Sequence, residues 1–280
     1  MHKTKLMVAL LGALSAMPVF AADAPAPAIT GNVGFASDYV FNGISQTFRS
    51  PAIQGGFDYA AANGLYVGTW ASNISGNQYT NASMELDVYA GYNGKVSDDL
   101  GYQIGLMNVT YPNGKAFSGV VDASNTITSA YKRWDTTEAI LGATWKSLNV
   151  KLTYTFTDWY GINNSGYSPF MWADGSSAAN SSEADLGSKG STYVEANYTY
   201  EVSEGLTVTA HAGHQKIQNF AALDYTDYKL AVSKLYQGFN FGLAYTTTNA
   251  TDNSLYHVKA NGDDKVLSGN ILAASVSRSF

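Results

Sequence analysis

Apolar and polar residues alternate one by one along most of this chain, and this period of two constrains the fold more than any other feature. The clearest stretch places Met84, Leu86 and Val88 on one face, with Glu85 and Asp87 on the other. Side chains of a strand point alternately to two faces, whereas a helix would scatter the same residues around its axis. The pattern therefore predicts β-strands with one apolar and one polar face.

The same alternation recurs in seven further stretches. Their apolar faces are expected at Val33, Phe35, Tyr39 and Phe41; at Ile53, Phe57 and Tyr59; at Leu152, Tyr154 and Phe156; at Val194, Ala196, Tyr198 and Tyr200; at Leu206, Val208, Ala210 and Ala212; at Tyr228, Leu230 and Val232; and at Phe239, Phe241, Leu243 and Tyr245. The first set predicts a strand that begins near Gly31 and continues through Tyr39 and Phe41.

Connections of two lengths alternate between about twelve predicted strands, an even number as in single-chain bacterial barrels. Short turns are expected at residues 61–64, 93–99, 146–147, 202–205 and 237–238. Longer loops are expected at 73–81, 112–135, 161–190, 216–224 and 248–264, with a short exception at 47–50. Short periplasmic turns and longer extracellular loops are typical of outer-membrane barrels. The predicted fold is all-β: one antiparallel transmembrane β-barrel with both termini in the periplasm.

Composition agrees with a barrel that lies in a membrane. Charged residues are 14% of the chain, against about 25% in soluble proteins, and aromatic residues are 13%. Beyond the N-terminus there is no run of about 20 apolar residues, so spanning helices are excluded. The chain has no cysteine, which excludes disulfides and cysteine-based zinc sites. Its net charge of −6 argues against nucleic-acid binding, which needs clustered Lys and Arg.

The N-terminus has the features of a secretory signal peptide. Lys3 and Lys5 precede a mainly apolar stretch at 6–17, and Val19-Phe20-Ala21 offers small residues for a signal peptidase. A transmembrane anchor is the alternative, but the apolar stretch is too short to cross a bilayer. Cleavage before Ala22 would divide the chain into a signal peptide at 1–21, a short leader at 22–28 and a single outer-membrane barrel domain at 29–280.

Aromatic residues gather near the ends of the predicted strands. Tyr and Trp favour the membrane interface because the ring is apolar and its polar atom can reach water. A soluble β-sandwich with aromatic core packing is the alternative. The belt beside the short turns is expected at Tyr59, Tyr92, Tyr102, Trp145, Tyr200, Phe239 and Phe280, and the belt beside the long loops at Tyr39, Phe41, Phe156, Tyr193 and Tyr245.

The C-terminal strand ends on an aromatic residue. Leu272, Ala274, Val276 and Phe280 share one face of this strand. A terminal Phe on an alternating strand looks like the signal that barrel-assembly machinery recognises, so Phe280 is the expected assembly signal. Outer-membrane lipids and that machinery are the expected partners, and a monomer is the expected state.

Five motifs stand out along the chain. They are Ser37-Asp38-Tyr39-Val40-Phe41-Asn42-Gly43-Ile44-Ser45-Gln46, Gln54-Gly55-Gly56-Phe57-Asp58-Tyr59, Gly68-Thr69-Trp70-Ala71-Ser72-Asn73, Glu85-Leu86-Asp87-Val88-Tyr89-Ala90-Gly91-Tyr92 and Asp224-Tyr225-Thr226-Asp227-Tyr228-Lys229. These motifs resemble the TorF-type porin family of proteobacterial outer-membrane proteins. The resemblance covers most of the chain after the signal peptide, apart from two long loops. It implies a porin in the outer membrane. The family often has a basic residue where this chain has Asn42.

The polar faces of the strands predict a narrow water-filled lumen. Rings of carboxylates in a confined pore favour cations, so a modest cation preference is expected for small polar solutes that diffuse through. The alternative is that the carboxylates pair with buried lysines and plug the barrel. The residues expected to line the lumen are Asp38, Asp58, Glu85, Asp87, Glu138, Lys151, Glu195, His211, Asp227 and Lys229.

Other functions are less well supported by the sequence. A closed barrel whose loops at 112–135 and 161–190 bind a ligand or partner remains the main alternative. An outer-membrane protease would need a His–Asp couple, for which His211 and His214 lie near Asp224 and Asp227. A phospholipase set could draw on a Ser with His211 and Asn197, but Ser is too abundant to support it. We expect no enzymatic activity, no cofactor and no metal site.

Overall fold

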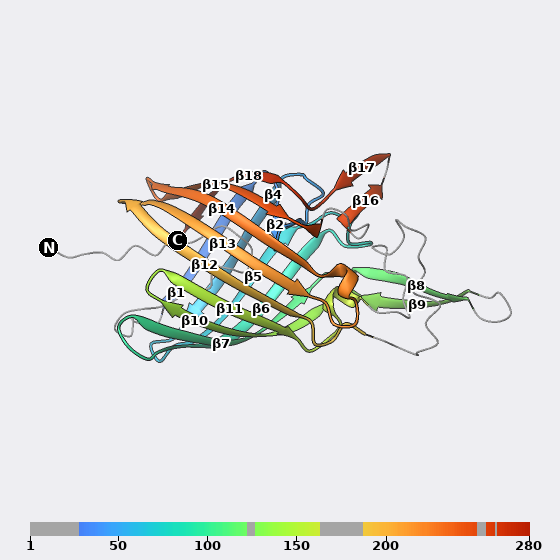
Figure 1. Ribbon diagram of the computed structural model, residues 1–280, viewed down its shortest axis with the longest axis horizontal. Helices are drawn as coiled ribbons and strands as arrows, with labels where there is room; N and C mark the ends of the chain where they lie inside the picture. Colours follow the sequence, from blue (N-terminus) through green and yellow to red (C-terminus); the bar gives the residue numbers. More distant parts are fainter. Residues whose placement is uncertain (1–27, 122–126, 163–186, 251–255, 261) are drawn as a thin grey trace.

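Twelve strands of the chain form one closed, antiparallel barrel (Figure 1). The computed structural model describes residues 28–121, 127–162, 187–250, 256–260 and 262–280. The predicted signal peptide and all but the last residue of the leader lie outside these residues. Among the described residues, no helix is long and apolar enough to cross a membrane.

The barrel strands are joined in chain order, and the barrel closes where β1 pairs with both β4 and β18. The barrel strands are β1 (Ala28–Ala36), β4 (Ala52–Ala60), β5 (Leu65–Asn73), β6 (Met84–Lys95), β7 (Leu100–Thr110), β10 (Thr136–Trp145), β11 (Leu148–Thr155), β12 (Thr192–Ser203), β13 (Leu206–Lys216), β14 (Tyr225–Tyr236), β15 (Phe239–Thr248) and β18 (Ile271–Ser279).

Three small hairpins and two single 3-10 turns lie in the described connections. The hairpins are β2 (Val40–Phe41) with β3 (Ile44–Ser45), β8 (Lys115–Val121) with β9 (Ile127–Arg133), and β16 (His257–Ala260) with β17 (Asp263–Val266). The 3-10 turns are η1 (Trp159–Gly161) and η4 (Ala221–Leu223).

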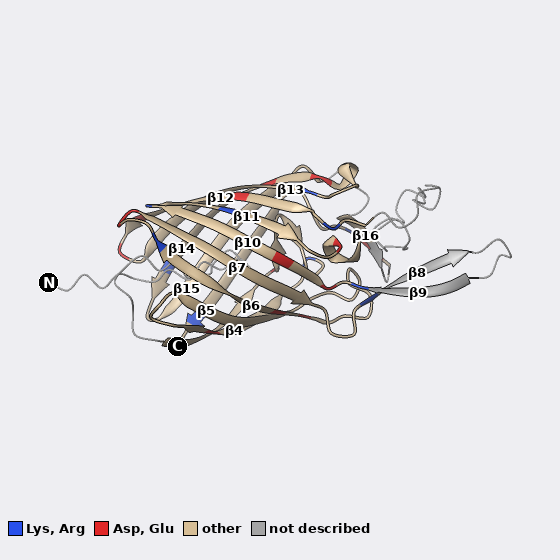
Figure 2. Ribbon diagram, turned by 90° about the horizontal axis from the view of Figure 1, so that it is seen from below, with Lys and Arg blue, Asp and Glu red and all other residues tan. Residues whose placement is uncertain are grey.

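Apolar side chains cover the outside of the barrel, and polar side chains fill the inside. On β14, the outward Leu230 is 58% exposed, whereas the inward Asp227 is 1% exposed. The same alternation leaves Phe57 exposed on β4 and buries Glu138 on β10. Charged residues are sparse along the wall (Figure 2). A closed sheet has no unpaired edge, so it can present this apolar exterior to lipid. The predicted transmembrane barrel of about twelve strands is confirmed.

The two ends of the barrel differ in the length of their connections (Figure 1). One end carries short turns, the start of β1 and the C-terminus, whereas the β8–β9 and β16–β17 hairpins project from the other. In the turn between β14 and β15, Gln237 and Gly238 have φ of 50° and 79°. Two consecutive positive φ angles define the type I′ turn, whose twist matches an antiparallel pair. The predicted alternation of short turns and long loops is confirmed, apart from the first loop.

The first connection departs from the prediction. β1 ends at Ala36, and residues 37–51 fold into the barrel interior with the β2–β3 hairpin at their centre. Asn42 and Gly43, with φ of 44° and 82°, form the turn of this hairpin. The predicted continuation of the first strand through Tyr39 and Phe41 is therefore wrong, as is the predicted short loop at 47–50. The chain leaves the barrel sheet after Ala36, before Tyr39 and Phe41, and Asp38 bonds to Ser45 and Thr47 within the loop. The Asn-Gly pair, which accepts two positive φ angles readily, then reverses the chain inside the barrel.

The structure shows one of the two predicted aromatic belts completely and the other in part. All seven aromatic residues predicted beside the short turns are exposed on the outer face, as are Phe156 and Tyr245 beside the long loops. Tyr39 and Tyr193 are instead buried inside, and Phe41 lies on the inward hairpin. Their placement in the belt was wrong because Tyr193 falls on the inner face of β12 and the other two belong to the inserted loop.

Candidate functional site

The inserted loop at 37–51 is held together by its own polar side chains. Asp38 accepts hydrogen bonds from Ser45 Oγ at 2.6 Å and from Thr47 Oγ1 at 2.9 Å. Thr47 Oγ1 also accepts the backbone N–H of Tyr39 at 3.1 Å. Burial raises the pKa of the Asp38 carboxyl, and the hydrogen bonds from Ser45 and Thr47 offset this only in part. The loop therefore has a defined internal structure.

Arg49 anchors the same loop to the chain that enters β18. Its guanidinium donates to the backbone carbonyls of Val266, Ser268 and Asn270, at 3.0, 2.6 and 3.2 Å. Lys265 donates to the carbonyl of Phe48 at 3.1 Å. A planar guanidinium that meets three carbonyls fixes orientation as well as position. The loop is thus attached firmly at the end of the barrel that carries the long connections.

The β2–β3 hairpin connects opposite walls of the barrel. The hydroxyl of Tyr39, just before β2, donates to Glu85 Oε1 on β6 at 2.6 Å. At the other end, a Cβ added to Gly43 would stand 2.8 Å from Cβ of Asp227 on β14. β6 and β14 are separated by five strands in either direction around the barrel, so they face each other. The hairpin therefore divides the lumen.

An acidic cluster lies behind the hairpin, on the inner faces of β6 and β10. It consists of Glu85, Asp87 and Glu138, each at most 4% exposed. Glu85 accepts hydrogen bonds from Tyr39 and from Tyr111, both at 2.6 Å. Neither carboxylate oxygen of Asp87 has a hydrogen-bond partner among the residues that the structure describes. Buried aromatic residues cover this cluster, so its carboxylates are largely withdrawn from solvent.

Basic and acidic side chains meet on the four neighbouring strands β11 to β14. Lys151 forms an ion pair with Glu195. His211 Nε2 lies 2.9 Å from Asp227 Oδ2, and its Nδ1 lies 2.8 Å from Asn197 Oδ1 and 3.5 Å from Glu195 Oε2. Each ring nitrogen thus faces an oxygen acceptor.

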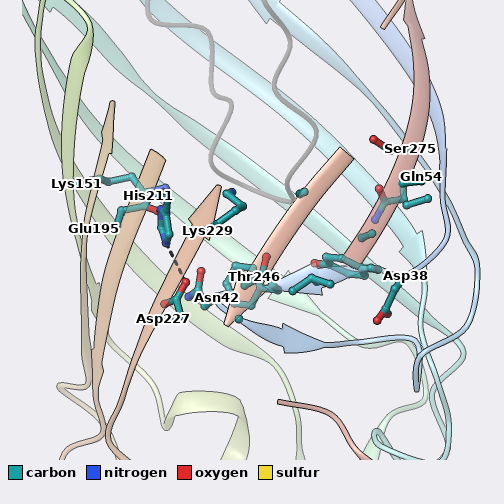
Figure 3. A pocket seen from close by; sticks show the side chains of 18 residues that line it. Asp38, Asn42, Gln54, Lys151, Glu195, His211, Asp227, Lys229, Thr246 and Ser275 are labelled. Carbon is teal, nitrogen blue, oxygen red and sulfur yellow. Dashed lines mark hydrogen bonds and ion pairs between the residues drawn. The ribbon is translucent and has the colours of Figure 1, made fainter. Parts of the chain in front are cut away.

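A cavity of about 80 Å³ lies beside this mixed cluster, against the hairpin (Figure 3). Its other wall is the inner face of β15, β18, β1 and β4, where small residues such as Ala36, Ala244 and Ser275 line it. On the opposite side of the barrel, the bulky Tyr66 and Met107 are buried. This cavity is therefore off-centre in the barrel, on the side where the inward side chains are small.

The structure places all ten predicted lumen residues inside the barrel, in separate groups. Asp38 lies on the inserted loop rather than on a strand, and Asp58 accepts a hydrogen bond from Tyr89 at 2.6 Å. The cavity brings together Asp38, Lys151, Glu195, His211, Asp227 and Lys229, whereas Glu85, Asp87 and Glu138 are outside it. Sequence reasoning missed the hairpin tip, although its Asn-Gly pair is the strongest short-range hairpin signal.

The two histidines weighed for a protease site face opposite sides of the barrel wall. His214 is exposed on the outer face, where Nδ1 lies 2.9 Å from Thr226 Oγ1. His211 and Asp227 do form a couple, but it is buried inside, where a membrane lipid could not reach it. Asp224, the other acid weighed for that site, accepts the backbone N–H of Ile217 at 2.6 Å. In the described part of the chain, no three His, Asp or Glu side chains are arranged to hold a metal ion.

Comparison with known proteins gives a family and a set of similar folds. The KdgM porin matches with a TM-score of 0.49 at 10% identity, over 90% of this chain and 99% of that one. The NanC porin matches with a TM-score of 0.49 at 13% identity, over the same shares of the two chains. No curated protein matches in sequence. The model of the family described as "Bacterial protein of unknown function (Gcw_chp)" matches residues 21–280. The chain therefore belongs to the Gcw_chp family.

Proposed function

We propose that this protein is a porin-like channel of the outer membrane, through which small polar solutes diffuse passively. The observation that carries the proposal is a closed barrel with an apolar exterior and a polar, off-centre cavity beside an inward hairpin. The resemblance to the TorF-type porin family also supports this proposal. The first motif of that resemblance, residues 37–46, lies in the inserted loop at 37–51. In this proposal the chain is exported by a cleaved signal peptide, is inserted by barrel-assembly machinery, acts as a monomer and has no enzymatic activity.

The ion preference of the channel follows from the charges that face the cavity. Asp38, Glu195 and Asp227 line it, against Lys151 and Lys229. A surplus of carboxylates in a confined path favours cations. The surplus is small, because the acidic cluster on β6 and β10 is covered. The cation preference thus remains a prediction, and we expect it to be modest.

A closed barrel that presents its loops to a ligand is the second candidate. The observation that favours it is the buried aromatic cluster near the long-connection end. Tyr79 stacks on Tyr111 with 4.5 Å between ring centroids, and Tyr160 lies edge-on to Tyr111. In this reading the cluster blocks passage and the long loops carry the function.

Solute uptake by proteoliposomes separates the two candidates. The refolded barrel is reconstituted, and vesicle swelling is followed with neutral solutes of increasing size, from glycerol to a disaccharide. A channel gives swelling that is fast for glycerol and falls steeply with size. Vesicles that contain a correctly folded barrel and swell no faster than empty ones would rule out the channel and favour the closed barrel.

A further inference from the structure

A second cavity lies between the inserted loop and the connections at the long-connection end of the barrel. Its volume is about 30 Å³, and no charged side chain of the described residues lines it. Most of its wall is aromatic, so we call it the aromatic cavity. The six aromatic residues that line it are Phe41, Tyr79, Trp159, Tyr160, Tyr225 and Tyr256.

The rings of the aromatic cavity meet at steep angles rather than in stacks. Trp159 and Tyr160 have centroids 5.1 Å apart and planes at 79°, and Tyr225 and Tyr256 have centroids 5.5 Å apart and planes at 77°. Tyr160 has a φ of 45°, which is unfavourable for a bulky side chain, so its ring is held in place by its surroundings. Rings that meet in this way form the corners of a small enclosure, and aromatic rings attract cations.

Two buried oxygen atoms of the lining side chains have no hydrogen-bond partner among the described residues. They are Oε1 of Gln78 and the hydroxyl oxygen of Tyr256, on side chains that are 3% and 4% exposed. The amide of Gln46 in the same wall is fully engaged, because it accepts from the Tyr79 hydroxyl and donates to the Ile44 carbonyl at 2.9 Å. Buried polar groups are rarely left unpaired, so these two oxygen atoms indicate a bound donor.

A carboxylate lies one aromatic layer behind the cavity wall. Tyr79 stacks on Tyr111 with 4.5 Å between ring centroids, and the Tyr111 hydroxyl donates to Glu85 Oε2 at 2.6 Å. Burial and the nearby charge of Glu85 raise the pKa of the Tyr79 hydroxyl. The negative charge therefore acts at the wall of the aromatic cavity, where it favours a cation.

We propose that the aromatic cavity binds a small organic ammonium ion, such as methylammonium. Its charge is attracted by the rings, and its N–H groups donate to Gln78 Oε1 and to the hydroxyl oxygen of Tyr256. A volume of about 30 Å³ holds about two water-sized groups, which matches the carbon and the nitrogen of methylammonium. Phe41 lines both this cavity and the larger one beside the hairpin. The assignment rests on the proposed channel and names a class of cation for it.

Methylammonium and methanol, which are nearly equal in size and differ in charge, test the proposal directly. Binding of each to the refolded barrel is measured by saturation-transfer NMR of the methyl protons, in maltoside micelles whose headgroups carry no competing ammonium. We expect methylammonium to bind at least about tenfold more tightly than methanol. Gln78→Leu should weaken methylammonium binding about tenfold, because it removes an acceptor for a charged donor. Trp159→Leu should weaken it several-fold. Equal binding of the two probes by the wild-type barrel would overturn the assignment, as would unchanged methylammonium binding by Gln78→Leu.

Matched controls separate the site from folding and from conduction. Gln218→Leu changes an exposed glutamine, whose side chain donates to Asn219 Oδ1 at 3.1 Å, and Trp145→Leu changes a tryptophan that is 57% exposed on the outer face. Both should leave methylammonium binding unchanged. Should Trp159→Leu fail to fold, Gln78→Leu and the wild-type comparison decide. Conductance is measured separately: methylammonium binding without conduction contradicts the channel and keeps the site, whereas conduction without methylammonium binding does the reverse.

Discussion

Gly43 at the tip of the inward hairpin lies against Asp227 on the barrel wall, so closely that a Cβ on Gly43 would stand 2.8 Å from the Asp227 Cβ. The φ of Gly43 is +82°, a backbone conformation that L side chains rarely adopt. Conformation and contact thus both require glycine at this position. At its other end, the hairpin is held to the opposite wall by the hydrogen bond from Tyr39 to Glu85. The position of this hairpin therefore determines how wide the lumen is beside it.

Substitution of the tip glycine should disturb that path. Gly43→Ala should displace the hairpin from Asp227 and give a noisier channel with an altered mean conductance in planar bilayers. Gly238→Ala is the matched control, because Gly238 has a φ of +79° but nothing lies within 4 Å of its added Cβ. Both variants carry a similar backbone cost of about 1–2 kcal/mol. Identical channel behaviour of the two variants would contradict the role of the hairpin contact.

The hydrogen bond at the other end of the hairpin, from Tyr39 to Glu85, should contribute measurably to the stability of the barrel. Tyr39→Phe removes the 2.6 Å hydrogen bond to Glu85, which is 2% exposed. Loss of a hydrogen bond to a buried carboxylate should lower the free energy of unfolding by about 1.5–3 kcal/mol. Urea unfolding in lipid vesicles measures it, with Tyr200→Phe on the exposed outer face as the control. A double variant with Glu85→Leu, which removes the acceptor, should lose much less than the sum of the single changes. Additive losses would argue against a direct interaction.

The buried Asp38 should make the stability of the barrel depend on pH. Its pKa is raised above the ordinary value of 3.8 by burial. The folded state then binds the proton more tightly than the unfolded state, so stability is greatest below pH 3.8 and falls as pH rises through the raised pKa. Asp38→Asn keeps an acceptor for Ser45 and Thr47 and should remove this part of the pH dependence. Melting temperatures in detergent from pH 3 to pH 8 test it. The highly exposed Asp98 provides the control variant Asp98→Asn, and a wild-type profile that Asp38→Asn leaves unaltered would refute the assignment.

A new charge at two neighbouring residues of β14 should reduce the stability of the barrel by different amounts. Leu230 faces outward and is 58% exposed, whereas Ala231 faces inward. Leu230→Lys places an ammonium in the bilayer and should cost about 2–4 kcal/mol if it lies near the midplane. Ala231→Lys places the same group in the polar lumen and should cost much less. Unfolding in phospholipid vesicles compares the two, and equal losses would contradict the assignment of the faces.

Much of the fold could be predicted because it depends on interactions between residues close together in the sequence. Alternation within a strand decides which side chain faces lipid, and loop length decides which end each connection occupies. The apolar faces at Leu230 and Phe57 follow from their neighbours alone. The same rule failed at Tyr39 and Phe41, because the chain leaves the sheet after Ala36 and enters the inserted loop. In that loop the hydrogen bonds of Asp38 and the turn at Asn42-Gly43, rather than the alternation, decide the backbone.

The site could be predicted only as an inventory of inward polar residues. Position in a strand predicts that Asp87 and Asp227 both face inward, and both do. It does not predict that the hairpin and its aromatic neighbours cover Asp87 and leave Asp227 beside a cavity. That separation depends on contacts between segments far apart in the sequence, such as Tyr39 with Glu85. Three-dimensional packing was needed to distinguish a lumen wall from a covered cluster.

Single-channel recording from the refolded wild-type barrel in a planar bilayer, under a potassium chloride gradient, tests the central claim most directly. Steady openings with a reversal potential that indicates a modest preference for potassium are the predicted result. Silence from a barrel that is shown by its heat-modifiable migration to be folded would contradict the channel and leave the closed, loop-presenting barrel.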